Sequence, residues 1–215
     1  MSSLAASADR GDPNPIHYPH TTEHAGGVTP KRIVVVYGFW IFLLSDIVMF
    51  SVLFATYAVL VDQTAGGPSG RELFDLRNTA IETALLLVSS FTCGLAAVGG
   101  QARRVSWFYA AMAATFVLGA AFIGLEVREF AGLVAQGAGP TRSAFLSAFF
   151  TLVGCHGLHV TVGLLWLLTM MAQVYAKGFR ADILRRTFCF ILFWHALDII
   201  WVALFTNVYL MGGAT

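Results

Sequence analysis

Five long apolar stretches, joined by short polar connections, constrain the fold of this 215-residue chain more than any other feature. A helix needs about 20 mostly apolar residues to cross the hydrocarbon core of a bilayer. Stretches of that length cover residues 33–61, 79–99, 105–126, 143–175 and 187–211. Helices are expected because lipid offers no partner to the backbone groups of an isolated strand. The sequence therefore predicts an all-α integral membrane bundle of five transmembrane helices.

Composition supports a membrane protein. Hydrophobic residues make up 57% of the chain and charged residues 12%, with a mean hydropathy of +0.73. A soluble domain is closer to half apolar and a quarter charged. The net charge of +1 and the lack of a basic run give no support for a nucleic-acid partner. Cys93, Cys155 and Cys189 lie in apolar stretches without a CxxC pair, which favours free buried thiols.

The first 32 residues differ from the rest of the chain. They contain four prolines and many polar residues, and no apolar segment follows a basic start. We therefore expect a disordered tail over residues 1–32 and not a signal peptide. His17, His20 and His24 could chelate a metal, although a solvated tail explains them more simply. Residues 33–215 form the predicted transmembrane domain.

The distribution of Lys and Arg predicts the orientation in the membrane. Nine of these residues lie in or beside the tail, the second connection and the fourth connection, and four lie on the other side. Because cytoplasmic segments are enriched in Lys and Arg, the N-terminus is expected in the cytoplasm. An odd number of spans then places the C-terminus in the periplasm.

Ionisable side chains inside the apolar stretches are the candidate functional residues, because each costs about 2.5–3.5 kcal/mol at the centre of a bilayer. Five of them are expected at a similar depth near the centre: Asp46, His156, His159, His195 and Asp198. Residues three apart on a helix share a face, so each histidine on the last two stretches has a polar neighbour beside it. We predict one polar cluster that links the first, fourth and fifth stretches.

Three further acids are expected at the outer edge of the membrane. Glu82 lies near the start of the second stretch, and Glu126 and Glu129 lie at the end of the third.

The histidines allow a metal site, a proton relay or polar packing between helices. Structural or catalytic zinc requires at least three protein ligands, and two histidines three apart on one helix cannot bind a haem iron from opposite faces. Packing is therefore the favoured interpretation, with proton transfer and metal binding as alternatives. No catalytic, cofactor-binding or metal-binding residue is assigned in this chain.

Three motifs resemble a known family. They are "YGFWIFLLSDIVMFSVLFATYAVL" at residues 37–60, "HGLHV" at 156–160 and "WHALDIIW" at 194–201. Together they resemble the subunit III family of haem–copper respiratory oxidases. Within this family the chain is most similar to the subunit of the bo-type ubiquinol oxidase. The features that carry this similarity are the five spans, the first connection "VDQTAGGPSGRELFDL" and the segment "FIGLEVREF".

The resemblance implies an accessory subunit without a catalytic centre of its own. Haem b, haem o and copper are then expected in subunit I, which oxidises ubiquinol, reduces oxygen to water and pumps protons. It further implies direct contact with subunit I, subunits II and IV in the same complex, bound phospholipid, a role in stable assembly, and location in the bacterial inner membrane. The family carries an acidic residue, in some members a carbodiimide-reactive glutamate, at the position of Asp46.

Two other interpretations remain open at this point. The chain could be subunit III of a cytochrome c oxidase or a homologue associated with nitric oxide reductase. A different class, a stand-alone transporter or proton channel, would also use buried acids and histidines. The sequence shows no inverted repeat or broken helix pair, features that transporters often have.

Overall fold

The computed structural model describes residues 31–67, 70–73 and 75–211. The helices are α1 (Lys31–Leu60), α2 (Gly70–Leu73), α3 (Leu76–Gln101), α4 (Val105–Ala135), α5 (Ala144–Lys177), α6 (Ala181–Leu204) and the π-helix η1 (Phe205–Met211). Five helical segments are long and apolar enough to cross a membrane, with α6 and η1 counted as one. The predicted five-helix architecture is therefore confirmed, while the predicted tail lies almost entirely outside the described residues.

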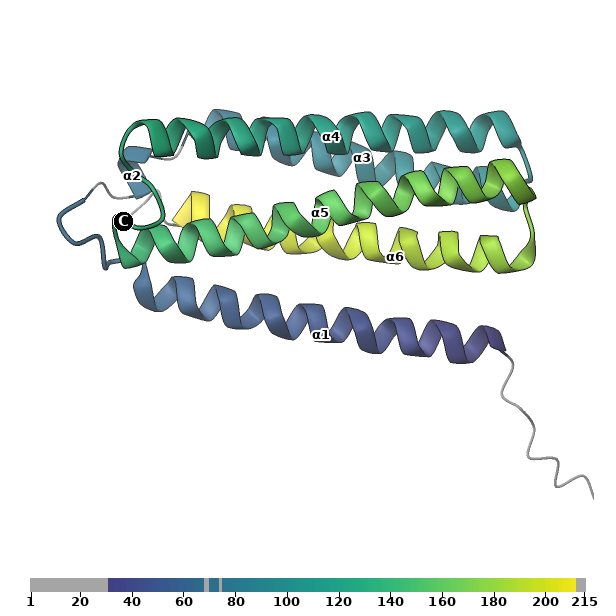
Figure 1. The fold of residues 1–215 in the computed structure, drawn as a ribbon, viewed down its shortest axis with the longest axis horizontal. Coiled ribbons are helices and arrows are strands. Elements are labelled where there is room, and N and C mark those ends of the chain that lie inside the picture. The colour runs from purple at the N-terminus through teal and green to yellow at the C-terminus, as the bar shows by residue number, and fades with distance from the viewer. Residues whose placement is uncertain (1–30, 68–69, 74, 212–215) are drawn as a thin grey trace, which may run out of the picture.

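Four of the long helices form a bundle, and the fifth lies against its side. In the bundle, α3 packs on α4 and α6, and α5 packs on α4 and α6. Helix α1 contacts α5 and α6 and diverges from them towards its N-terminal end (Figure 1). Only 11% of its most apolar window is buried, against 50% for α5 and for the last span. Helix α1 is therefore the peripheral member of the fold.

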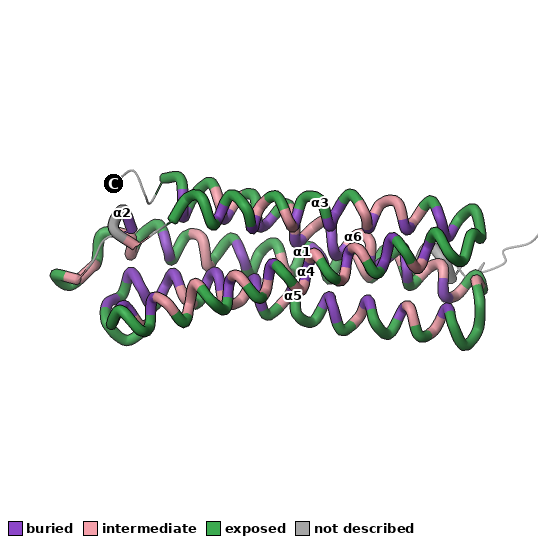
Figure 2. Tube along the Cα trace, turned by 90° about the horizontal axis from the view of Figure 1, so that it is seen from above, coloured by how far each residue is buried: buried purple, intermediate pink, exposed green. Residues whose placement is uncertain are grey.

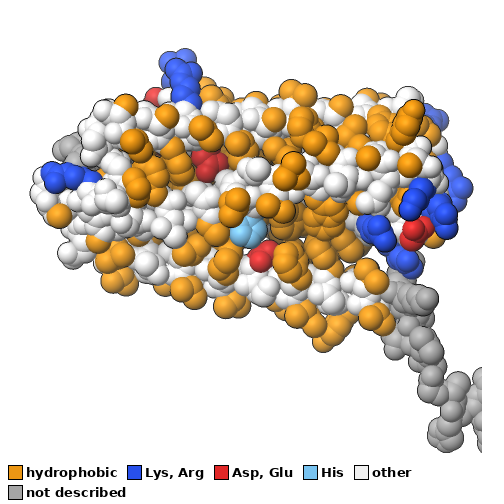
Figure 3. Space-filling view, in the orientation of Figure 1, with side chains coloured by type: hydrophobic (Ala, Val, Ile, Leu, Met, Phe, Trp, Pro, Cys, Tyr) orange, Lys and Arg blue, Asp and Glu red, His pale blue; other side chains and the backbone are white. Residues whose placement is uncertain are grey.

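The two ends of the molecule carry different connections. The start of α1, the α3–α4 turn and the α5–α6 turn share one end, and the other connections and η1 share the opposite end (Figure 1). Lys and Arg side chains gather at the first of these ends, whereas hydrophobic side chains cover the length of the helices (Figure 3). This arrangement matches a bundle whose helices run along the bilayer normal.

Helix α4 continues to Ala135, nine residues beyond the predicted end at Glu126. It ends where Gly137 adopts a left-handed conformation with φ of 79°. There Ala138 N–H donates to the Leu133 carbonyl and Gly137 N–H to the Val134 carbonyl, the pair of bonds of a Schellman motif. The polar residues after Glu126 resemble a connection by hydropathy, but this cap sets the true end.

Two other helices begin earlier than predicted, for a similar reason. Helix α3 begins after Asp75, whose carboxylate accepts hydrogen bonds from the backbone N–H groups of Arg77 and Asn78. Helix α6 begins at Ala181, six residues before the predicted start, because its first turns are charged and still helical. Helix α2 has no counterpart in the prediction, whereas η1 falls within the predicted fifth stretch and differs from it only in its π winding.

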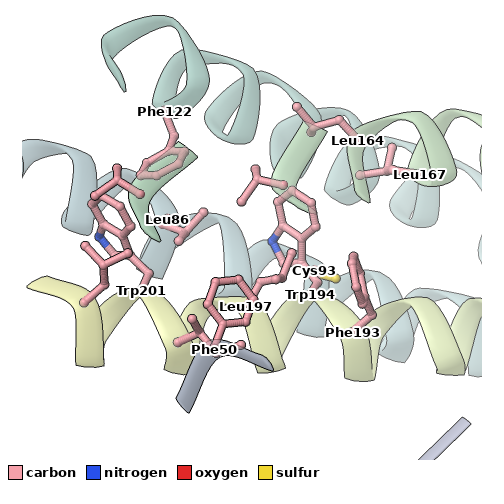
Figure 4. Close-up of a cluster of buried hydrophobic side chains, with 14 of the residues drawn as sticks. Phe50, Leu86, Cys93, Phe122, Leu164, Leu167, Phe193, Trp194, Leu197 and Trp201 are labelled. Carbon is pink, nitrogen blue, oxygen red and sulfur yellow. The ribbon is translucent and has the colours of Figure 1, made fainter. Parts of the chain in front are cut away.

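The core lies between the four bundle helices. Buried positions recur regularly along the helices rather than gathering at one end (Figure 2). Two tryptophans of α6, Trp194 and Trp201, point into the space between α3, α4 and α5 (Figure 4). Each is 2% exposed or less, as expected for aromatic residues deep in the bundle.

A slot built from small residues holds Trp194. A Cβ atom added at Gly163 would lie 2.9 Å from Trp194 Cζ3, and one at Gly119 would lie 3.0 Å from Trp194 Cη2. The indole N–H donates to Ser89 Oγ at 2.9 Å, and Trp201 donates in the same way to Thr83 Oγ1 at 3.0 Å. Both bonds join α6 to α3, so the two indoles fix the distance and rotation between these helices.

A double-mutant cycle on Ser89→Ala and Trp194→Phe tests the contribution of this bond. We expect a coupling free energy of about 0.5–1.7 kcal/mol, the range for hydrogen bonds between membrane helices. The measurement is the free energy of unfolding of the purified protein in detergent, followed by tryptophan fluorescence. Additive effects of the two substitutions would show that the bond does not join α3 to α6.

Candidate functional site

His156 is fully enclosed at the centre of the bundle. Its ring lies 5.1 Å from Trp201, 5.9 Å from Phe122 and 6.3 Å from Phe50, measured between ring centroids. These rings come from α6, α4 and α1, so four helices surround the imidazole. Neither ring nitrogen has a hydrogen-bond partner among the described residues. A buried polar group in this condition requires an explanation.

His159 lies one turn further along α5 and faces α1. Its Nδ1–H donates to the Cys155 carbonyl at 2.8 Å. Asp46 of α1 interacts electrostatically with this histidine, and the Phe50 ring lies 5.3 Å away. Figure 3 shows an acidic side chain beside a histidine among hydrophobic side chains in the middle of one face. The structure therefore brings Asp46 and His159 together between α1 and α5.

His195 and Asp198 form a second pair on α6. His195 Nδ1–H donates to the Ile191 carbonyl at 2.8 Å, and Asp198 interacts electrostatically with His195 and with Ser90 of α3. Asp198 Oδ1 and Ser90 Oγ nevertheless lack a partner in hydrogen-bonding geometry among the described residues. This pair faces α3, whereas Asp46 and His159 lie between α1 and α5. The single cluster that joins all five residues stays a prediction.

The three glutamates lie inside their helices. Glu82 is in the second turn of α3, and Glu126 and Glu129 lie nine and six residues before the end of α4. Glu82 and Glu126 are 1% and 3% exposed. The three carboxyl groups interact electrostatically with one another, and Tyr209 of η1 donates its hydroxyl to Glu129 Oε2 at 3.3 Å.

The described helices bring together no set of side chains that could ligate a metal ion. Within residues 31–67, 70–73 and 75–211, no three His, Cys, Asp or Glu side chains converge as a ligand set. His159 and His195 each use Nδ1 on their own helix. What the arrangement can do chemically is bridge helices through hydrogen bonds and hold protons.

A large cleft lies between α1, α3 and α6, at the end of the molecule where α1 begins. Its volume is about 1050 Å³, and it opens because α1 diverges from the bundle. Apolar and small residues form most of its wall, with Gln101 and Arg185 among the few polar ones. Sequence reasoning did not find this cleft, because hydropathy does not reveal how far two helices lie apart.

Sequence reasoning did not assign Tyr209, Gly157 or Ser90 to the candidate site. Tyr209 appears in the sequence as an aromatic residue at the membrane surface, but it is fully buried. Gly157 has no side chain, and its role is to leave space for the Glu126 carboxyl group of α4. The single signal available was the position of Gly157 between two histidines in an apolar stretch.

Asp198→Ala tests whether the α6 pair stabilises packing on α3. We expect a loss of about 1–3 kcal/mol in the free energy of unfolding, because His195 and Ser90 lose their acidic neighbour in an apolar layer. For a chain of this size each kcal/mol lowers the melting temperature by roughly 2–4 °C. The matched control is Ile199→Ala, since Ile199 is 71% exposed and should cost less than about 0.5 kcal/mol. Equal stability of the two variants would contradict a packing role.

Comparison with known proteins gives consistent matches along the whole described part. The family model described as cytochrome c oxidase subunit III matches residues 20–213. The chain is 50% identical to cytochrome bo(3) ubiquinol oxidase subunit 3 of Pseudomonas aeruginosa over 217 aligned residues, which cover 99% of each protein.

Two relatives from Bacillus extend the comparison. Quinol oxidase subunit 3 of Bacillus subtilis is 45% identical over 175 residues, 81% of this chain and 86% of the relative. Cytochrome c oxidase subunit 3 of Bacillus sp. (strain PS3) is 45% identical over 179 residues, 81% of this chain and 84% of the relative. With five membrane-crossing helices and bacterial relatives, the chain is a multi-pass protein of the bacterial inner membrane. It belongs to the cytochrome c oxidase subunit III family, the subunit III family of haem–copper oxidases.

Proposed function

We propose that this chain is the accessory subunit III of a bo-type ubiquinol oxidase, a proton-pumping terminal oxidase of the aerobic respiratory chain. The observation that carries the proposal is the 50% identity to the Pseudomonas aeruginosa subunit over 99% of both proteins. Ubiquinol oxidation and oxygen reduction then take place in subunit I, with haem b, haem o and copper. This chain contacts subunit I directly and shares the complex with subunits II and IV.

Its own contribution is to stabilise the assembly. Two acidic side chains in the middle of the described helices face other helices of the same chain, Asp46 towards His159 and Asp198 towards Ser90. A rigid bundle with apolar outer faces presents a fixed surface to neighbouring subunits. The excess of Lys and Arg at the end where α1 begins supports an orientation with that end in the cytoplasm.

Purification through an affinity tag on this chain tests the proposal. We expect a larger multi-haem subunit to copurify, haem b and haem o to be extracted from the complex, and the complex to oxidise ubiquinol. A tagged chain that purifies alone, without haem and as a single species, would contradict the accessory role.

Subunit III of a cytochrome c oxidase is the second candidate, because the relative from strain PS3 is 45% identical. The same preparation separates the two candidates. Oxidation of reduced cytochrome c without oxidation of ubiquinol would favour this second candidate over the first.

Bound phospholipid is part of the proposed function, and the cleft between α1, α3 and α6 is the site that fits it. An apolar cleft inside a bilayer accommodates acyl chains, and Trp40 and Phe188 supply wide apolar surface. Arg185 and Gln101 lie at the end of the cleft near the membrane surface, where a cation attracts an anionic headgroup. The occupant is therefore a phospholipid with its phosphate near Arg185.

Ala97→Trp tests this site, because Ala97 lines the cleft and a large side chain there would fill it. We expect the purified complex to lose phospholipid, measured by extraction and mass spectrometry, while haem content stays normal. The control is Val98→Trp, since Val98 is 61% exposed and does not line the cleft. An unchanged lipid content in Ala97→Trp would rule out this cleft as the lipid site.

A further inference from the structure

The glutamates of α3 and α4 form a buried group that the proposed function does not use. Glu126 interacts electrostatically with both Glu82 and Glu129, so it is central among the three. Glu82 and Glu126 are almost fully buried, and each leaves its Oε2 atom without a hydrogen-bond partner among the described residues. Two carboxyl oxygens are thus held away from water with their hydrogen-bonding capacity unused.

An independent observation comes from α5. The Glu126 carboxyl group packs directly on Gly157, so closely that a Cβ atom added there would overlap it. The residue before Gly157 is His156, which is 0% exposed and has two unpartnered ring nitrogens. Its ring contacts Phe122, which lies one turn before Glu126 on the same face of α4. The unpartnered imidazole of His156 and the unpartnered carboxyl group of Glu126 are thus connected through Phe122 of α4 and through the α5 backbone at Gly157.

Residues of α6, of η1 and of the start of α3 surround the rest of this region. Trp201 of α6 contacts His156 and lies 6.3 Å from the Tyr209 ring, whose hydroxyl donates to Glu129. Asp75, at the start of α3, adds a further negative charge near Glu129. The titratable groups around Glu126 are thus the acids of α3 and α4, His156 of α5 and Tyr209 of η1.

Among the residues that the structure describes, no cation forms an ion pair with these carboxyl groups. The one ion pair among the described residues joins Arg180 to Asp182, at the opposite end of the chain's helices. Two unit charges 4 Å apart repel by about 4 kcal/mol at an effective dielectric constant of 20, and burial of each charge costs several kcal/mol more. Three ionised carboxyl groups in one apolar layer are therefore unfavourable, whereas each proton that they bind reduces the repulsion between them.

We propose that Glu82, Glu126, Glu129 and His156 form a buried proton-binding site, in which at least one exchangeable proton is shared between the carboxyl groups and internal water links Glu126 to His156. Water at this place supplies the missing partners, since buried water typically bonds to otherwise unsatisfied polar groups. The ligand is the proton itself, and no bond other than O–H is made or broken. The proposal goes beyond the accessory role and does not depend on which electron donor the complex uses.

Infrared spectroscopy of the purified complex at neutral pH tests the site, because a protonated carboxyl group has a C=O stretching band that shifts in D₂O. We expect Glu126→Gln to remove one such band, and Glu82→Gln and Glu129→Gln to shift it. The control is Asp62→Asn in the exposed first connection, which should leave the carboxylic bands unchanged. Identical carboxylic bands in the wild type and in all three glutamine variants would overturn the proposal. Since each of the three reports on the same proton, failure of one variant to assemble leaves the other two decisive.

A glycine pair tests the link to His156. Gly157→Ala should displace the Glu126 carboxyl group and shift the band, because the new methyl group occupies its place. Gly154→Ala, one turn earlier on α5, should leave the band where it is, since a Cβ there meets only Phe130 at an ordinary 3.5 Å. Equal spectra for these two variants would show that the proton site does not extend to α5.

Discussion

In the apolar layer of a membrane, a hydrogen-bonding group can find a partner only on its own helix or on a neighbouring one, because lipid supplies none. Most Ser and Thr hydroxyls of this bundle donate to a carbonyl one turn earlier, as Thr161 does to Gly157. Side-chain hydrogen bonds between different helices are fewer. Trp194 and Trp201 each reach from α6 to α3, and Thr92 of α3 meets Thr115 of α4 at 2.8 Å. With the bond from Tyr109 of α4 to the Met171 carbonyl of α5, these few hydrogen bonds join neighbouring helices of the bundle.

The same constraint explains which parts of the fold could be predicted. Five helices, their order and their antiparallel neighbours follow from apolar length and short connections alone. The ends of the helices do not, because charged turns at a membrane surface are helical and yet resemble loops in hydropathy. Helix α4 is therefore longer than predicted, and α6 starts earlier. The change from α to π winding at Phe205 has no signal in residue spacing.

The site was predictable where one helix carries both partners. His195 and Asp198 share a face because they are three residues apart, and the structure brings them together. The contact between Glu126 and the backbone at Gly157 could not be predicted from the sequence, because it depends on the rotation of α4 against α5. A single sequence encodes that rotation only through the shapes of many packed side chains. Glu126 was accordingly expected at a membrane edge, while the structure encloses it against Gly157 of α5.

The π winding of η1 has a consequence for chain length. A wider helical turn accommodates more residues per revolution than an α-helix, and it is this winding that brings the Tyr209 hydroxyl to Glu129. Removal of one residue between Leu204 and Tyr209 would rotate the phenol around the helix axis by somewhat less than the roughly 100° per residue of an α-helix. The C-terminal segment therefore tolerates changes of side chain better than changes of register. An insertion or deletion there would move the Tyr209 hydroxyl away from the Glu129 carboxyl group of α4.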